Sequence, residues 1–70
     1  MNSVEEIRKM DSAELVELAK ATGRNYMPLD YDLAKSMTAG FISEINRRGR
    51  EVAKRNKKPY YPLTFGKLMR

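Results

Sequence analysis

Residues 30–56, DYDLAKSMTAGFISEINRRGREVAKRN, decide the fold of this 70-residue chain. At 100° per residue, the larger apolar side chains of this stretch fall within an arc of roughly 120° on a helix. Asp30 is placed to act as the N-cap, and Asp32 lies in the first turn, where negative charge is favoured. The pattern predicts one long helix from about Tyr31 to Asn56. Its apolar arc contains Leu33, Ala34, Met37, Phe41, Ile45 and Val52, and is widened by Ile42 and Ala53.

Two glycines interrupt this long helix. Gly40 and Gly49 each weaken a helix by about 1 kcal/mol relative to Ala. Arg48-Gly49-Arg50 is the expected position of a break, so two helices separated at this point are the alternative to a single one. Pro59 ends the helical stretch in either case, because proline removes a backbone donor and clashes with the preceding turn.

Two shorter helices are predicted upstream, each from a capping-box signature. Ser3 is followed by Glu6, which opens a helix through about Lys9 with Val4 and Ile7 facing inward. Asp11 is followed by Glu14 in the same way, which opens a second helix that runs to about Thr22.

The end of the second helix is predicted from Gly23, which stands where a C′ residue is expected. The following residues, 24–29, should form a loop punctuated by Pro28. The apolar face of this second helix, at i, i+3, i+4, i+7 spacing, consists of Leu15, Leu18, Ala19 and Thr22.

The last twelve residues read differently. Pro59-Tyr60-Tyr61-Pro62 should be extended, with the two tyrosines pointing in opposite directions. Residues 63–70 are expected to form a short strand or a loose tail, in which Leu63 and Phe65 fold back over a thin core. The sequence therefore predicts an all-α protein: a small three-helix domain at residues 1–58, followed by an extended, basic and aromatic tail at residues 59–70.

The composition excludes several classes of function. The chain has no Cys and no His, which excludes disulfides, the usual zinc ligands and the usual general base. Its carboxylates do not pair into a catalytic set, and it has no glycine-rich phosphate loop. We therefore expect a non-enzymatic protein with no catalytic residues, no metal and no cofactor.

The same composition bears on location. No segment approaches the roughly 20 consecutive apolar residues that a membrane span needs. Charged residues among the first nine do not fit a signal peptide. We expect a cytoplasmic protein without a membrane partner.

The charge is distributed unevenly along the chain. Residues 1–46 carry five basic and eight acidic residues, a net charge of −3, whereas residues 47–70 carry nine basic residues and only Glu51 as an acid, a net charge of +8. Such a difference between the two parts of a sequence indicates a polyanionic partner for the basic part.

The basic residues have helical order. Arg47, Arg50, Lys54 and Lys57, at i, i+3, i+7, i+10, form one stripe opposite the apolar arc, over about 15 Å of helix. Cations at matched spacing suit phosphates, which release counterions on binding. On the same face upstream, the small residues Ser36, Gly40 and Ser43 allow a close approach, and serine can donate to phosphate oxygens. The stripe is flanked by Arg48, Arg55 and Lys58, and is followed by Tyr60 and Tyr61, which can stack on exposed bases or fold back over the core.

The function expected from these features is nucleic-acid binding, to DNA or RNA, through phosphate contacts of the third helix, without sequence-specific reading. The alternative is a small regulator or inhibitor, of the kind that phages and mobile elements encode, which makes a protein–protein interaction with an acidic surface of a polymerase or nuclease. In that case the tail residues Tyr60, Tyr61, Leu63 and Phe65 would be exposed together as an apolar patch. A homodimer is a third possibility, if two short helices cannot cover the apolar arc of the long one.

The stretch from Ile7 to Ile45 resembles the helix–extended loop–helix modules of the transcription terminator Rho N-terminus and of SAP domains. The matching segments are Val4 to Ile7, Asp11 to Gly23, Leu33 to Lys35 and Phe41 to Ile45. The resemblance implies a small all-helical nucleic-acid-binding module and leaves the C-terminal 25 residues outside it.

Overall fold

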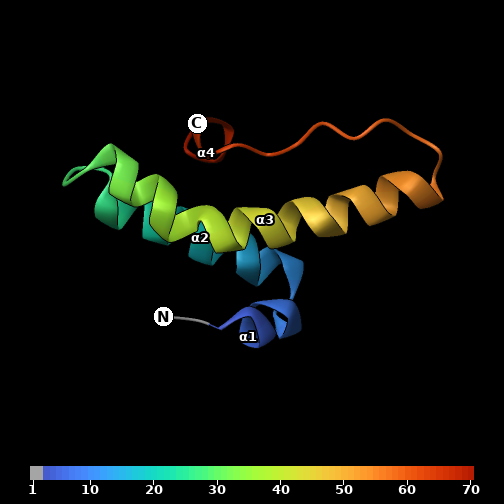
Figure 1. Cartoon of the computed structure of the whole chain (residues 1–70), viewed down its shortest axis with the longest axis horizontal. Helices are drawn as coiled ribbons and strands as arrows, with labels where there is room; N and C mark the ends of the chain where they lie inside the picture. Colours follow the sequence, from blue (N-terminus) through green and yellow to red (C-terminus); the bar gives the residue numbers. More distant parts are fainter. Residues whose placement is uncertain (1–2) are drawn as a thin grey trace.

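The computed structural model describes residues 3–70 and is helical. Its elements are α1 (Val4–Lys9), α2 (Ser12–Tyr26), α3 (Tyr31–Arg55) and the one-turn α4 (Phe65–Leu68), with no strand among the described residues. The helices α2 and α3 lie side by side and antiparallel, α1 lies beside the start of α2, and the C-terminal segment runs back along α3 (Figure 1). The predicted all-α class is confirmed; Met1 and Asn2, which begin the predicted 1–58 domain, lie outside the described residues.

The helices α1, α2 and α3 begin directly after the residues that the sequence predicts as their N-caps. The Ser3 hydroxyl accepts a hydrogen bond from the Glu6 amide, and the Asp11 carboxylate accepts one from the Ala13 amide. The Asp30 carboxylate accepts from the amides of both Asp32 and Leu33. These bonds satisfy first-turn amides that have no partner within their own helix, and they confirm the predicted helix starts.

The second helix ends later than predicted, because Gly23 is not its C′ residue. Gly23 is buried inside α2, which continues to Tyr26. A Cβ atom at this position would lie 2.6 Å from the Met69 sulfur and 3.2 Å from the Phe65 ring. The glycine therefore makes room for the returning C-terminal segment, and the predicted loop is shorter than residues 24–29 because its first three residues are helical.

The third helix is continuous over 25 residues, so the break considered at Gly49 does not occur. Gly49 instead lies under the Tyr60 ring, whose Cζ atom would be 2.7 Å from a Cβ at this position. The helix ends at Arg55, and Lys57 adopts a φ of 54°, in the left-handed region that non-glycine residues seldom occupy. This backbone reversal, followed by Pro59, turns the chain back along α3.

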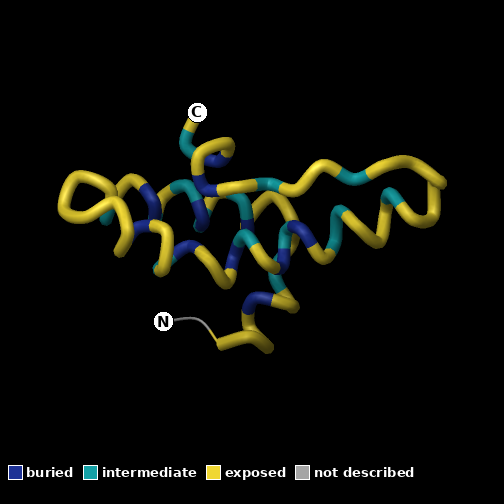
Figure 2. Tube along the Cα trace, turned by 45° about the horizontal axis from the view of Figure 1, so that its top comes forward, coloured by how far each residue is buried: buried dark blue, intermediate teal, exposed yellow. Residues whose placement is uncertain are grey.

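The core lies where α2, α3 and the C-terminal segment meet (Figure 2). Phe65 and Leu68 of α4 are buried in it, and the Phe65 ring stacks edge-to-face on Tyr31 with centroids 5.3 Å apart. The expectation of a strand or a loose tail at residues 63–70 is therefore wrong from Phe65 onward. The expected return of Leu63 and Phe65 over the core is confirmed, and residues 59–62 carry no regular structure, as expected. The buried apolar residues are Ile7, Leu15, Ala19, Ala34, Phe41, Phe65 and Leu68.

Three apolar side chains assigned to the interior are more exposed than the sequence indicated. Val4 is 65% exposed, which leaves Ile7 as the buried residue of α1, and Leu33 and Val52 at the two ends of the apolar arc are 41% and 48% exposed. The exposure of Val52 follows from the length of α2, which is shorter than α3 by ten residues, whereas Leu33 lies beside the loop that joins the two helices.

Gly49→Ala provides a test of the C-terminal packing. Helix propensity alone would favour alanine by about 1 kcal/mol. The added methyl group would meet the Tyr60 ring, which would have to leave its place on α3 and break its hydrogen bond to Asn46. The lost packing of the ring should offset the gain in helix propensity. The lost hydrogen bond then leaves a net loss of stability of about 1 kcal/mol, the usual contribution of such a bond. Urea denaturation measures it, and a stabilised variant would contradict the packing.

Candidate nucleic-acid interface

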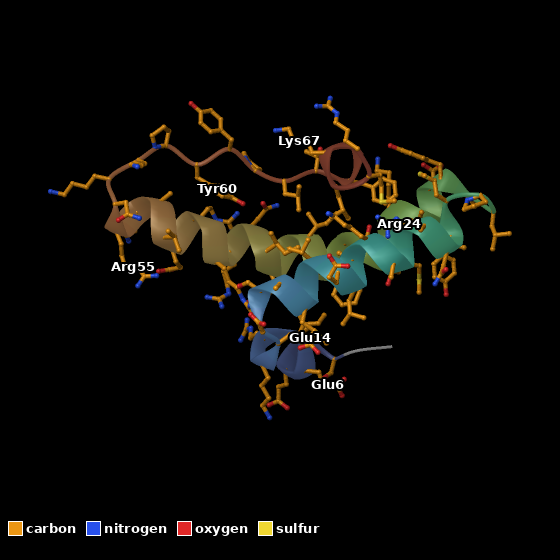
Figure 3. The ribbon with its side chains drawn as sticks, turned by 180° about the vertical axis from the view of Figure 1, so that it is seen from behind. Glu6, Glu14, Arg24, Arg55, Tyr60 and Lys67 are labelled. Carbon is orange, nitrogen blue, oxygen red and sulfur yellow. The ribbon has the colours of Figure 1, made fainter. Side chains whose placement is uncertain are left out.

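The C-terminal part of α3 projects beyond α2. The Arg48 guanidinium reaches the hydroxyl of Ser12, the first residue of α2, so residues 49–55 lie past the start of that helix. Figure 3 places Arg55 at this end of α3, on the side away from the C-terminal segment, whereas Glu6 and Glu14 lie on α1 and α2. The charge difference along the sequence is therefore a difference in space, between a basic end of α3 and a more acidic body.

Glu44 is the buried acid of this region, with only 6% of its side chain exposed. Arg47 donates to both of its carboxylate oxygens, at 2.9 and 2.8 Å, and Arg48 donates to one of them at 2.8 Å. The hydrogen bonds from Arg47 lower the pKa of Glu44 to about 2, against the opposing effect of burial and with further help from Arg48. The same hydrogen bonds raise the pKa of Arg47.

Arg48 links three helices. Besides Glu44, its guanidinium donates to the Ser12 hydroxyl at 3.0 Å and to the carbonyl oxygens of Ile7 and Arg8 at 3.2 and 3.1 Å. These carbonyls belong to the last turn of α1, where a cation is favoured; the Ile7 carbonyl also accepts from the Met10 amide. Arg48 was predicted to assist in phosphate binding, but the structure uses its guanidinium to hold α1 and the start of α2 against α3.

The Glu44 ion pairs predict how stability depends on pH. The pKa of Glu44 is lower in the folded protein, about 2, than its ordinary value of 4.5. A depressed carboxyl pKa stabilises the fold above the unfolded value, and that contribution is lost as pH falls from about 4.5 to about 2. We expect the urea midpoint to drop over this range, and to drop less in Glu44→Gln, which has no charge to lose. Parallel curves for the two proteins would contradict this assignment.

The other predicted cations are exposed. Among residues 3–70, ion pairs are formed only by Glu44 with Arg47 and Arg48, so the remaining cations at this end have no carboxylate partner in the described chain. They are Arg50, Lys54, Arg55, Lys57 and Lys58. Arg47, Arg50 and Lys54 share the outer side of α3 as predicted, but Lys57 does not continue their stripe, because the helix ends before it and its φ is positive.

The two tyrosines after the stripe have different surroundings. The Tyr60 hydroxyl donates to the Asn46 side-chain oxygen, and its side chain points from the C-terminal segment toward α3 (Figure 3). Tyr61 is 76% exposed. The predicted opposite orientation is confirmed, and of the two rings Tyr61 is the one with a free face for stacking on a base.

Two of the hollows along α3 bear on binding. The first, here called the α1–α3 cleft, has a volume of about 230 Å³ and is lined by Arg8, Gly40, Ser43, Arg47 and Arg50, with Val4 and Ile7 at its α1 side. The second, the overhang groove, has a volume of about 450 Å³ and a mainly apolar lining that includes Val16, Ile45, Val52, Ala53 and Pro59. Arg8 was not among the predicted site residues, because nothing in the sequence shows that α1 folds onto the middle of α3.

Comparisons of the chain with protein-family models, with curated proteins and with solved structures found no match. Within the described residues, no helix has the length and apolarity to cross a bilayer, and no group of His, Cys, Asp or Glu could hold a metal ion.

Proposed function

We propose that the protein binds nucleic acid through phosphate contacts at the basic end of α3. The observation that carries this proposal is the set of five exposed cations between residues 50 and 58, which have no ion-pair partner in the described chain. Two of them, Lys54 and Arg55, lie in the last turn of α3, where a cation stabilises the helix by about 0.3–1 kcal/mol. That effect falls off beyond the last turn, so it does not account for Arg50.

Concentrated like charge disfavours the folded state through repulsion. Phosphates relieve this repulsion, and the counterions released from the nucleic acid add a salt-dependent driving force. The exposed cations contact the phosphate backbone of the nucleic acid. Such contacts position the protein on the strand without reading the base sequence. Tyr61 adds an exposed ring on which a base of a single strand can stack.

The test is fluorescence anisotropy with labelled single-stranded DNA, duplex DNA and RNA of equal length across a salt series. We expect log Kd to rise linearly with log salt. In the triple variant Arg50→Gln, Lys54→Gln, Arg55→Gln, the slope should fall by about 3, since each lost phosphate contact removes about 1.

A matched control removes the same charge elsewhere. Lys9→Gln, Arg24→Gln and Lys35→Gln change three exposed cations on α1, α2 and the first half of α3. We expect this control to keep most of the salt dependence. Equal losses in the two triple variants, or no binding by the unaltered protein at low salt, would refute the proposal.

The overhang groove supports a second candidate, a regulator or inhibitor that docks on an acidic protein. The predicted docking patch on the tail does not form, since Phe65 is buried and Leu63 is half-buried. The groove supplies another apolar surface, with Val52 48% exposed in it and Lys58 at its edge. A stoichiometric partner retained from nuclease-treated lysate, and lost in Val52→Asp, would favour this candidate. A partner lost only in the Arg50, Lys54 and Arg55 variant would place the protein contact on the basic end of α3 and not in the groove, and no retained partner would oppose the candidate.

A further inference from the structure

We propose that the α1–α3 cleft is a phosphate-binding site that holds one phosphate group of the bound strand. This inference rests on the proposed function for the source of the phosphate, and adds a defined position to an otherwise diffuse basic surface. The cleft joins cations from two elements, Arg8 from the last turn of α1 and Arg47 and Arg50 from α3.

The charges around the cleft favour an anion. Its lining contains three arginines and one acid, Glu44. Both oxygens of that carboxylate already accept hydrogen bonds from arginines, and its low pKa keeps it ionised and paired. The acid therefore serves to orient Arg47, and the lining keeps an excess of positive charge.

Arg47 is prepared for a second acceptor. A guanidinium has five N–H donors in one plane. Two of them, on Nε and Nη2, are directed at Glu44, which leaves three donors on a group whose plane is already fixed. Nearly half of the side chain, 48%, is exposed. A phosphate can thus be bound with little further loss of side-chain freedom.

Gly40 keeps the cleft open. It lies in the middle of α3, where glycine weakens a helix by about 1 kcal/mol relative to alanine, and it has no positive φ that would require glycine. A Cβ atom there would meet only the Ile7 side chain, at the ordinary distance of 3.5 Å. Neither backbone conformation nor packing explains this glycine, whereas close approach of a ligand to the helix does.

The neighbouring Ser43 is exposed and adds a hydroxyl donor to the same lining. The volume of about 230 Å³ is below the range of pockets that enclose a whole drug-sized ligand, about 300–1,000 Å³. It suits a phosphate with part of its sugar, for which Val4 and Ile7 offer an apolar side.

The decisive variant is Gly40→Gln, which fills the cleft without changing the charge. Glutamine favours a helix over glycine, so this variant should be at least as stable as the unaltered protein. We expect it to bind a ten-nucleotide single-stranded DNA about tenfold more weakly, a loss of about 1.4 kcal/mol, close to the lower bound for one hydrogen bond to a charged group. Arg8→Gln should show a similar loss, whereas its neighbour Lys9→Gln, with the same change in charge, should not.

Amide NMR spectra distinguish this inference from the proposed function. The oligonucleotide, and inorganic phosphate at higher concentration, should shift the amides of Gly40 and Ser43. Neither ligand should shift the amide of Ser43 in Gly40→Gln. Oligonucleotide binding that is equal in Gly40→Gln, Arg8→Gln and Lys9→Gln would overturn the cleft and leave nucleic-acid binding intact. If phosphate shifted these amides in a protein that binds no oligonucleotide, the cleft would bind free phosphate, and the claim that it holds a phosphate group of a nucleic-acid strand would be refuted.

Discussion

Replacing Arg48 with alanine is expected to destabilise the protein by about 3 kcal/mol, in the range found when one partner of a buried ion pair is removed. The variant would leave Glu44 with Arg47 alone, and would take donors away from the Ile7 and Arg8 carbonyls and from Ser12. A 70-residue domain has a total stability on the order of 4–10 kcal/mol, so this single side chain accounts for a large share.

The loss should be concentrated in α1. That helix has six residues, and Ile7 is its buried residue, so the Arg48 bonds to its last turn are its main polar attachment to α3. Helices this short do not persist alone in water. Hydrogen exchange should therefore show α1 amides losing protection at urea concentrations where α2 and α3 remain folded.

Two controls test whether the guanidinium geometry is responsible. Arg50→Ala removes an exposed arginine from the same helix and should change stability by less than about 0.5 kcal/mol, as is usual for surface positions. Arg48→Lys keeps the charge but cannot reach several acceptors in one plane, so its stability should lie between those of the unaltered protein and Arg48→Ala. If Arg48→Ala and Arg50→Ala unfolded at the same urea concentration, Arg48 would not be the link between the helices.

The local features of the fold could be predicted from the sequence, because they depend on neighbouring residues. Ser3, Asp11 and Asp30 cap their helices through amides two or three residues away, and such spacings are visible in a sequence. The length of α3 follows from its apolar arc and from Pro59.

The structural reason for glycine could not be predicted at two positions: the sequence indicated a helix end at Gly23 and left open a helix break at Gly49. At Gly23 and Gly49, the reason for glycine is a side chain that returns from the C-terminal segment, Met69 in one case and Tyr60 in the other. Local rules relate glycine to helix ends and breaks. Contact with a segment more than ten residues away has no local signature, so neither role could be inferred.

The candidate site could be predicted only in part, because some of its features depend on neighbouring residues and others on contacts between distant segments. The exposed cations at positions 50, 54 and 55 follow from helical spacing alone. Glu44 with Arg47 and Arg48, at i+3 and i+4, is also a pattern that the sequence contains, and it could have indicated that two arginines are engaged. The placement of Arg8 beside them depends on how α1 packs, which a six-residue helix with one buried side chain does not reveal.

Replacing Asn46 with alanine is the second change with a large expected effect, a loss of about 3 kcal/mol, since several bonds of about 1 kcal/mol are removed together. Asn46 lies on α3 with 9% of its surface exposed. Its amide donates to the Leu63 carbonyl at 2.9 Å, and its oxygen accepts from the Leu63 amide at 2.7 Å and from the Tyr60 hydroxyl. The Asn46 side chain thus provides the hydrogen-bond partners for the backbone groups of Leu63, which a neighbouring strand would provide in a sheet.

The consequence should be release of the C-terminal segment. Without Asn46, the polar groups of Leu63 either stay in place unpaired or regain water by detaching, and detachment exposes Phe65 and Leu68. We expect the Tyr31–Phe65 ring contact to be lost, visible as a change in the ring resonances of Phe65, and trypsin to cleave after Lys67 more rapidly.

Tyr60→Phe separates the contribution of the Tyr60 hydrogen bond from that of the two hydrogen bonds to Leu63. It removes one hydrogen bond and keeps both bonds to Leu63, so it should lose only about 1 kcal/mol and leave Phe65 in place. If Asn46→Ala were no less stable than Tyr60→Phe, the burial of Phe65 and Leu68 alone would hold the segment. If the segment detaches as expected, Leu63, Phe65 and Leu68 become accessible, and the altered protein acquires the apolar patch that a protein-binding regulator would need. Asn46 would then be the residue that keeps this surface covered and leaves the basic end of α3 as the exposed site.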